Sequence, residues 1–360
     1  MKYLLLILAS LCTVGCADDT GSPSQKRSRQ MEGIANSNVQ SITADGETSP
    51  VVSADDAADD PAVWINYNEP EKSFIIGTDK KAGLYVYDLD GKIVDFQKLG
   101  NENNVDLRQR LDGDGFDGHE TLIAASNRTT MTVDILTINN MGRLKLLGTY
   151  PTDPEPYGLC VGLPSNKKSL RVLLNYKNGL VDIRDVNFEN GVVSAMPVAT
   201  LQIPGQTEGC AFDDDGQEFY IGQEDGGIWR FPMENPDNNG ELQAGLNDET
   251  GLVEDVEGLD IYHSKEGRKV IVASSQGDFT YVAFEITEGA LKPLRKFRIK
   301  DNPKNGVDGV QETDGVAVTS AYLNDRYPEG ILVVQDGENE DGFQNFKIVD
   351  WRKIDAIFEN

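Results

Sequence analysis

Basic residues are scarce in this chain, which has 33 Lys and Arg against 60 Asp and Glu and a formal net charge of -27 over 360 residues. A surface field of that sign repels phosphate backbones, so the composition argues against nucleic acid as a partner. The excess of carboxylates suits the binding of cations instead, and especially of calcium.

Histidine and long helical patterns are also nearly missing. The chain has two histidines, His119 and His263, and two isolated histidines cannot supply a conventional transition-metal centre. No long segment shows the 3.6-residue apolar period of a helix, whereas 36 glycines separate short, β-branched runs. An all-β protein is therefore predicted, and 360 residues are enough for a well-filled core without a disulfide scaffold.

The N-terminus has the pattern of an export signal. Residues 1–16, MKYLLLILASLCTVGC, combine a charged start, an apolar stretch of about ten residues that is too short to span a membrane stably, and small residues at the end. The end from Thr13 to Cys16 resembles a bacterial lipobox, in which Cys16 becomes the lipid-modified first residue. Residues 17–40 are polar and aperiodic, as in a flexible tether.

We therefore expect an exported protein that is anchored to the bacterial cell envelope by a lipid on Cys16. That lipid would be its one contact with a membrane. Leucine is commoner than threonine at the position of Thr13, so a secreted or periplasmic protein is the alternative. After processing, Cys160 and Cys210 remain besides Cys16. They form either a disulfide or two buried thiols, and the sequence leaves both open.

A repeat of roughly fifty residues organises the rest of the chain, residues 41–360. Short stretches such as TEGC, VEGL and TDGV pair an acidic residue with glycine at the start of an apolar strand. One series of such positions is formed by Asp60, Asp106, Tyr157, Glu208, Glu257 and Asp314. A second series, offset by about twenty residues, marks one hairpin in each unit, at Lys80, Arg128, Lys177, Glu224, Gln276 and Asp336.

Each unit contains four short strands, which in the first unit are PAVWINY, SFIIGTD, GLYVYDL and IVDFQKL. Six units of four antiparallel strands predict a six-bladed β-propeller. The last unit provides only three strands, so we expect the segment around residues 40–54 to add the outer strand and close the ring. Strand parity places both repeated series on one face of the ring, at the mouth of the central channel.

This mouth is predicted to hold carboxylates and basic residues together. Convergent carboxylates without histidine or cysteine favour a hard cation such as calcium. Arginine and lysine recognise phosphate oxygens, so the combination favours a ligand with several phosphates. Lys80 and Lys81 can also be read as solvated residues of a hairpin, but a basic residue recurs at that place in the first three units.

With these residues assembled, the chain resembles the β-propeller phytases, the alkaline, calcium-dependent phosphomonoesterases that act on phytate, myo-inositol hexakisphosphate. The resemblance covers roughly residues 47–355. It rests on motifs in matching order and spacing, among them DAADDPAVW, GTDKKAGLYVYDLDGK, NNVDLR, AASNR, PYGL, QTEGCAFDDDG, QEDGGIW, DVEGLDIY, ASSQGDFTYVAFE and ETDGVAV.

The resemblance implies a set of site residues. Phosphate binding falls on Lys80, Lys81, Arg128, Tyr157 and Lys177, with Gln276 also at the site. Calcium-binding and water-activating carboxylates fall on Asp59, Asp60, Glu208, Glu224, Glu257, Asp308 and Asp314. Glu47 and Asp56 match further calcium positions. The residues expected to act in catalysis are Lys80, Arg128, Tyr157, Lys177, Glu208 and Glu224.

The reaction implied by the resemblance is that of a 3-phytase. A calcium-bound water attacks phosphorus directly, several Ca²⁺ ions serve as cofactors, and the substrate is phytate as its calcium complex. A monomer is expected. Two departures, Asn178 and Gln223, stand where relatives have acidic residues, and they bear on the number of ions. The chain has neither the RHGxRxP segment of histidine acid phosphatases nor the HCxxGxxR loop of cysteine phosphatases.

Two alternative functions follow from the same fold. A lactonase-like calcium propeller hydrolase needs an acidic metal mouth, but it does not need the basic residues Lys80, Lys81, Arg128 and Lys177. A non-catalytic propeller that binds a protein or glycan at the cell surface does not need a ring of carboxylates.

Overall fold

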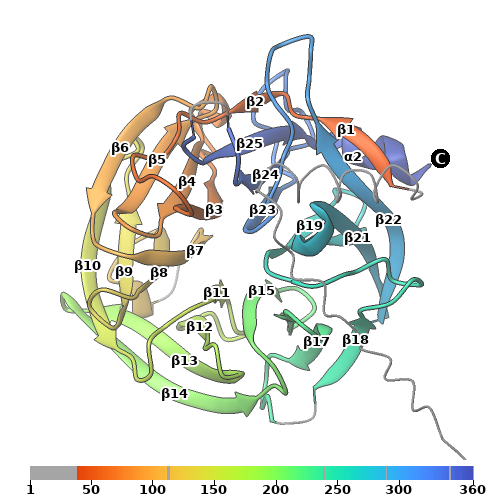
Figure 1. The fold of residues 1–360 in the computed structure, drawn as a ribbon. Helices are drawn as coiled ribbons and strands as arrows, with labels where there is room; N and C mark the ends of the chain where they lie inside the picture. The colour runs from red at the N-terminus through yellow and green to blue at the C-terminus, as the bar shows by residue number, and fades with distance from the viewer. Residues whose placement is uncertain (1–38, 112–113, 238–239, 289, 340–341, 360) are drawn as a thin grey trace, which may run out of the picture. The chain divides into compact units, whose positions relative to one another are not determined.

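The computed structural model describes residues 39–111, 114–237, 240–288, 290–339 and 342–359. The predicted signal peptide and nearly all of the predicted tether, residues 17–40, lie outside these ranges. Six small antiparallel sheets stand around a central channel, so the fold is the predicted six-bladed β-propeller (Figure 1). No helix among the described residues is long and apolar enough to cross a membrane.

The blades follow one another along the chain, each with its first strand innermost. Blade 1 consists of β3 (Ala58–Trp64), β4 (Phe74–Asp79), β5 (Gly83–Asp88) and β6 (Ile93–Lys98). Blade 2 consists of β7 (Glu102–Gln109), β8 (Thr121–Asn127), β9 (Thr132–Ile138) and β10 (Leu144–Pro151). Blade 3 consists of β11 (Leu159–Gly162), β12 (Leu170–Asn175), β13 (Leu180–Glu189) and β14 (Val192–Gln202).

The second half of the ring repeats this order. Blade 4 consists of β15 (Thr207–Asp213), β16 (Glu218–Gln223), β17 (Gly227–Pro232) and β18 (Glu241–Gly245). Blade 5 contains β19 (Leu259–His263), β20 (Lys269–Ser275), β21 (Thr280–Thr287) and β22 (Ala290–Lys300). Blade 6 contains β23 (Val316–Thr319), β24 (Ile331–Asp336) and β25 (Asn345–Asp350). Short 3₁₀ turns lie at Pro70–Lys72, Asp114–Phe116 and Gln276–Asp278.

The N-terminal segment closes the ring, as predicted. Strand β2 (Gly46–Glu47) pairs antiparallel with β25 and supplies the fourth strand of blade 6. Two further backbone hydrogen bonds extend this pairing. The Asp45 N–H donates to the Ile348 carbonyl oxygen and the Thr48 N–H donates to the Phe346 carbonyl oxygen, both at 2.8 Å. The structure adds one feature that was not predicted: β1 (Gln40–Thr43) pairs in parallel with β22 and makes blade 5 five-stranded. The N-terminal segment thus joins two blades.

The apolar core lies between neighbouring blades. Six clusters of buried side chains each draw on two adjacent sheets; the cluster with Trp64, Ile76 and Val86 from blade 1 also contains Ile123 and Leu136 from blade 2. The last blade is followed by a short helix. The last strand stops at Asp350, whose side chain caps the helix α2 (Trp351–Phe358) by accepting a hydrogen bond from the Arg352 N–H.

Glycine allows the innermost strands to approach one another at the channel. A Cβ atom on Gly209 would lie 1.7 Å from the Glu257 carbonyl oxygen of the next blade, and one on Gly158 would lie 1.9 Å from that of Glu208. Gly258 and Gly315 make the same approach to the next blade. The repeated acid-glycine pair therefore has a geometric reason: the glycine permits close packing of the strands, and close packing brings the acidic residues together.

A disulfide also joins two of these inner strands. Cys160 in β11 and Cys210 in β15 are bonded, with their Cα atoms 5.7 Å apart. The bond links blade 3 to blade 4 three residues after Tyr157 and two residues after Glu208. It therefore resolves the choice that the sequence left open in favour of the disulfide.

Candidate active site

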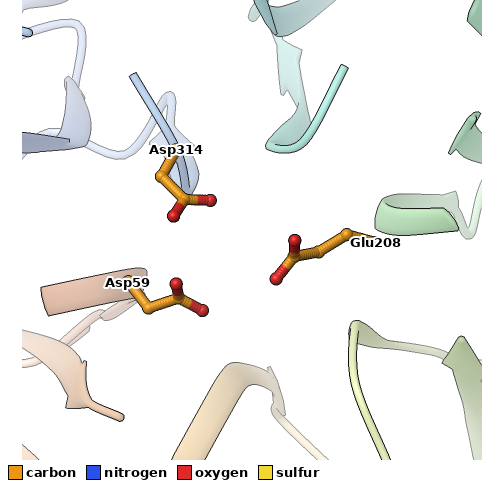
Figure 2. A group of neighbouring side chains, drawn as sticks. All are labelled: Asp59, Glu208 and Asp314. Atoms are coloured by element: carbon orange, nitrogen blue, oxygen red, sulfur yellow. The ribbon is translucent and has the colours of Figure 1, made fainter. Parts of the chain in front are cut away.

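Three buried carboxylates converge where the innermost strands begin. Asp59 comes from β3, Glu208 from β15, and Asp314 from the residues just before β23. One carboxylate oxygen of each lies within 4.8 Å of the other two. Figure 2 shows the three side chains pointing toward one another from three different blades. We call this group, Asp59, Glu208 and Asp314, the central trio.

A second group of three shares Glu208 with the first. Oxygens of Glu208, Glu224 and Glu257 also lie within 4.8 Å of one another. Glu224 follows β16 on the hairpin to β17, whereas Glu257 lies just before β19. An inner-strand position and a hairpin position therefore meet on one face of the ring, and Glu208 is the residue that both groups contain.

The cluster is short of positive charge. Burial raises the pKa of Glu224 to about 7 and that of Glu257 to about 8. Burial, followed by the neighbouring carboxylates, holds the pKa of Glu208 and of Asp314 well above their ordinary values. Asp59 Oδ2 and Glu224 Oε1 are buried and have no hydrogen-bond partner among the described residues. Buried, unpaired oxygens without nitrogen or sulfur ligands fit a hard divalent cation.

Lys80 is the one cation in ion-pair contact with the central trio among the described residues. Its ammonium lies 2.8 Å from Asp59 Oδ1, 2.7 Å from Asp56 Oδ1 and 3.8 Å from Asp314 Oδ2. Burial alone would lower the pKa of Lys80, but these three carboxylates raise it above its ordinary value. Lys80 therefore stays charged, and one lysine does not neutralise the whole cluster.

Arg128 reaches the same cluster through an amide. Its Nη1 donates to Asn103 Oδ1 at 3.1 Å, and Asn103 Nδ2 donates to Glu208 Oε1 at 2.7 Å. On its outer side the guanidinium contacts Glu155 Oε1 at 3.2 Å. The Arg128 side chain is 26% exposed, so it is accessible from solvent.

Tyr157 and Lys177 form a second connection to Glu208. The Lys177 ammonium lies 4.6 Å from the centre of the Tyr157 ring, a cation–π contact. Burial, followed by the neighbouring carboxylate of Glu208, raises the pKa of the Tyr157 phenol. The phenol therefore stays protonated beside Glu208.

Gln276 and Lys81 differ in their contacts with this cluster. Gln276 Nε2 donates to Glu257 Oε2 at 2.5 Å and orients that carboxylate. The Lys81 ammonium instead donates to the Ala54 carbonyl oxygen at 2.6 Å, on the outside of the hairpin. The structure therefore brings Gln276 to the carboxylates and places Lys81 at the rim.

Comparison with known proteins agrees with this site. The family model described as Phytase matches residues 17–360. Over 331 aligned residues the chain is 39% identical to a 3-phytase of Bacillus subtilis (strain 168). The aligned region covers 87% of this chain and 84% of the relative. The chain belongs to the phytase family.

Asp60 and Asp106 belong to neither carboxylate group in this member of the phytase family, and both instead contact backbone groups of the next blade. Asp60 Oδ2 accepts a hydrogen bond from the Val105 N–H at 3.0 Å, and Asp106 Oδ2 accepts one from the Val161 N–H at 2.8 Å. Both contacts join an inner strand to the next blade. Asp60 and Asp106 also line a separate cavity of about 390 Å³ in the channel. The sequence placed Asp106 at the mouth, and the structure shows that Asn103 stands there instead.

Glu47 and Asp308 lie in a different cluster, where the N-terminal strand β2 pairs with β25 and closes the propeller. Both carboxylates contact the fully buried ammonium of Lys347, at 2.6 Å and 2.5 Å. Asp336 Oδ2 at 3.0 Å and Asn339 Oδ1 at 2.8 Å complete its surroundings. This lysine cluster, Lys347 with Glu47, Asp308, Asp336 and Asn339, ties β25 to the N-terminal strand.

Sequence reasoning missed three residues of these two clusters. Asn103 bridges Arg128 and Glu208, Gln206 contacts the Tyr157 hydroxyl at 3.5 Å, and Lys347 centres the lysine cluster. A signal for Asn103 existed in the pair Asn103–Asn104, which occupies the place of the acid-glycine pair in the second repeat. No repeat signal marks Lys347, because its partners come from both ends of the chain.

The raised pKa values predict how the stability of the metal-free phytase varies with pH. Between the ordinary pKa of glutamate, about 4.3, and values of about 7 and 8, folded Glu224 and Glu257 bind protons that the unfolded chain has released. The free energy of unfolding must therefore fall as pH rises through this window. In chelator, we expect the melting temperature to drop by several degrees between pH 5 and pH 8.

Glu224→Gln and Glu257→Gln serve as the internal controls for this pH dependence, because each removes one titrating group. Both variants should flatten the slope, and added Ca²⁺ should flatten it in the wild type. A melting temperature in chelator that is constant or rises from pH 5 to pH 8 would contradict the assignment.

Proposed function

We propose that this protein is a calcium-dependent 3-phytase that releases inorganic phosphate from phytate at the mouth of the propeller. The observation that carries the proposal is Glu208, which belongs to both carboxylate groups and is connected to Arg128 and to Tyr157. Membership of the phytase family supports the same reaction.

The carboxylates of the two groups would hold the metal. Asp59, Glu208 and Asp314 offer one set of oxygen ligands, and Glu208, Glu224 and Glu257 offer another. Calcium suits them better than magnesium, because it accepts six to eight oxygens in flexible geometry, at roughly 2.3–2.6 Å. When bound, such ions lower the pKa of water and neutralise charge on phosphate oxygens.

The basic residues and the phenol bind and orient the phosphate. Lys80, Arg128 and Lys177 approach the carboxylates from three hairpins, so a phosphate between them meets positive charge on several sides. Fixed donors of this kind stabilise the charge that develops on the phosphoryl oxygens during transfer. Gln276 keeps Glu257 in place, and the rim position of Lys81 suits contact with a neighbouring phosphate of the same substrate.

Glu224 is suited to accept a proton from the attacking water. Its Oε1 is buried and has no hydrogen-bond partner among the described residues, so this oxygen is placed to face the water. It would take the proton of the attacking water, and the inositol oxygen that leaves would take up a proton as its bond to phosphorus breaks. Attack of water on phosphorus then needs no covalent phosphoenzyme.

Replacing Arg128 tests the proposed function. We expect Arg128→Ala to lower kcat/KM for phytate by about 10²–10³-fold, because it removes a fixed cationic donor from the phosphate. The matched control is Arg143→Ala, whose guanidinium is exposed on a blade edge and pairs with Asp95. The control should retain wild-type phosphate release. No release by the wild type with Ca²⁺, or an unchanged rate in Arg128→Ala, would overturn the proposal.

The two alternative functions account for fewer of the residues at this site. A lactonase-like hydrolase accounts for the carboxylates but not for Lys80, Arg128 and Lys177 around them. A non-catalytic binding propeller accounts for neither group. Phosphate release from the calcium complex of phytate, together with a monomer in solution, is what the phytase proposal expects.

For the N-terminus, we propose export and a lipid on Cys16 that anchors the enzyme to the bacterial cell envelope. The support is the lipobox-like sequence from Thr13 to Cys16. Labelling with radioactive palmitate should mark the wild type and not Cys16→Ser. Equal labelling of both would reject the anchor, and no labelling of the wild type would favour plain secretion.

A further inference from the structure

Asn103 joins two parts of the site that arise from different stretches of sequence. It is the second residue of β7, and its side chain is 1% exposed. Its Oδ1 accepts a hydrogen bond from Arg128 Nη1 at 3.1 Å, while its Nδ2 donates to Glu208 Oε1 at 2.7 Å. One amide therefore contacts the phosphate-binding cation of blade 2 and the shared carboxylate of blade 4.

The chemistry of these two partners fixes the orientation of the amide. A guanidinium only donates hydrogen bonds and an ionised carboxylate only accepts them. The Asn103 amide satisfies both with its oxygen toward Arg128 and its nitrogen toward Glu208. Its nitrogen also donates to Asn104 Oδ1 at 2.7 Å. An aspartate at this position would keep the acceptor for Arg128 but would face Glu208 with a like charge.

The place of Asn103 in the repeat supports a specific role. The Asn104 N–H donates to Ser126 Oγ at 3.0 Å, as the Gly258 N–H donates to Ser274 Oγ at 2.7 Å. Asn104 therefore corresponds to the repeated glycine, and Asn103 corresponds to Glu257. Blade 2 thus presents a neutral amide where blades 1, 4, 5 and 6 present carboxylates, which are Asp59, Glu208, Glu257 and Asp314.

We propose that Asn103 is a positioning residue that holds Arg128 at a fixed spacing from Glu208, so that guanidinium and carboxylate face the same phosphoryl group. The other contact of Arg128, Glu155, has a side chain that is 51% exposed and constrains it less. This inference rests on the proposed function, because it assigns phosphate to Arg128 and the cation to Glu208.

The first test measures cation binding without turnover. Calorimetric titration of the purified, metal-free protein with Ca²⁺ alone should show that Asn103→Ala weakens binding about 10-fold, within the range for loss of a residue that orients a metal ligand. Asn66→Ala is the matched control, since Asn66 is also buried but caps the loop after β3 through backbone N–H groups. The control should bind Ca²⁺ as the wild type does. Unchanged Ca²⁺ affinity in Asn103→Ala would overturn the proposal.

The second test is a double-mutant cycle for phytate hydrolysis. Asn103→Ala should lower kcat by about 10–100-fold in the wild type. Measured at saturating Ca²⁺, it should have a smaller effect in the Arg128→Ala background, because one of the two residues that it positions is absent. Additive effects, or a loss of melting temperature in chelator with normal kcat, would show a structural role only and overturn the proposal.

A substitute variant and the Ca²⁺ titration separate a folding defect, and a failure of the proposed function, from a failure of this inference. If Asn103→Ala does not fold, Asn103→Ser is used, because its hydroxyl is too short to bridge both partners. If the wild type binds Ca²⁺ but does not hydrolyse phytate, the proposed function fails, whereas the Ca²⁺ titration still decides whether Asn103 positions Glu208.

Discussion

Glu208→Gln is expected to lower kcat/KM for phytate about 10³-fold or more, because it removes a charge from both carboxylate groups at once. Glutamine has nearly the shape of glutamate, and it keeps an oxygen that can accept the Asn103 hydrogen bond. The loss therefore reports on charge rather than on packing. Ca²⁺ titration of the same variant should show weaker binding than in the wild type.

Glu218→Gln is the matched control for this prediction. Glu218 begins β16 in the same blade, is partly exposed, and pairs with Arg230 at 3.4 Å. Its replacement should leave kcat/KM and Ca²⁺ affinity close to those of the wild type. Equal activity in Glu208→Gln and Glu218→Gln would mean that Glu208 is not the shared ligand.

Lys347→Met is expected to lower the free energy of unfolding by about 3–5 kcal/mol. The Lys347 side chain is fully buried, and its ammonium balances Glu47, Asp308 and Asp336. Removing the ammonium leaves three carboxylates close together without a cation. Because Glu47 belongs to the strand that closes the ring, the substitution should destabilise the pairing of blade 6 with the N-terminal segment.

Urea unfolding in chelator measures this effect, with Lys92→Met as the control. Lys92 is exposed on the turn before β6 and pairs only with Asp90, at 3.3 Å, among the ion pairs of the described residues. Its replacement should change the unfolding free energy by about 0.5 kcal/mol or less. A loss below about 1 kcal/mol in Lys347→Met would contradict the account, because a buried pair that loses one partner costs more than that.

The propeller and much of its mouth could be predicted from the sequence, because each repeat places the same residue types at the same point of a blade. At Glu208, Glu257 and Asp314 a glycine follows the acid, and that glycine allows the inner strands to approach closely. Residues at matching positions in these repeats therefore lie at matching positions around the channel. In blade 2 Asn104 stands in place of the glycine, so the repeat spacing indicates Asp106 rather than Asn103.

Other features depend on contacts that no local pattern encodes. Lys347 meets Glu47 across 300 residues of chain, and this contact exists only after the ring has closed. The pairing of Cys160 with Cys210 depends on two inner strands coming within reach at the channel. Helix α2 does have a local signal, the cap Asp350 followed by apolar Trp351, Ile354 and Ile357, but a run of eight residues is too short to stand out as a helical period.

Phosphate release from phytate, followed in one sample through removal and return of Ca²⁺, tests the central claim most directly. The account predicts release with Ca²⁺, a loss of at least about 10²-fold after chelation, and recovery when Ca²⁺ is added back in excess. Full release in the presence of chelator, or no release with Ca²⁺ present, would contradict it.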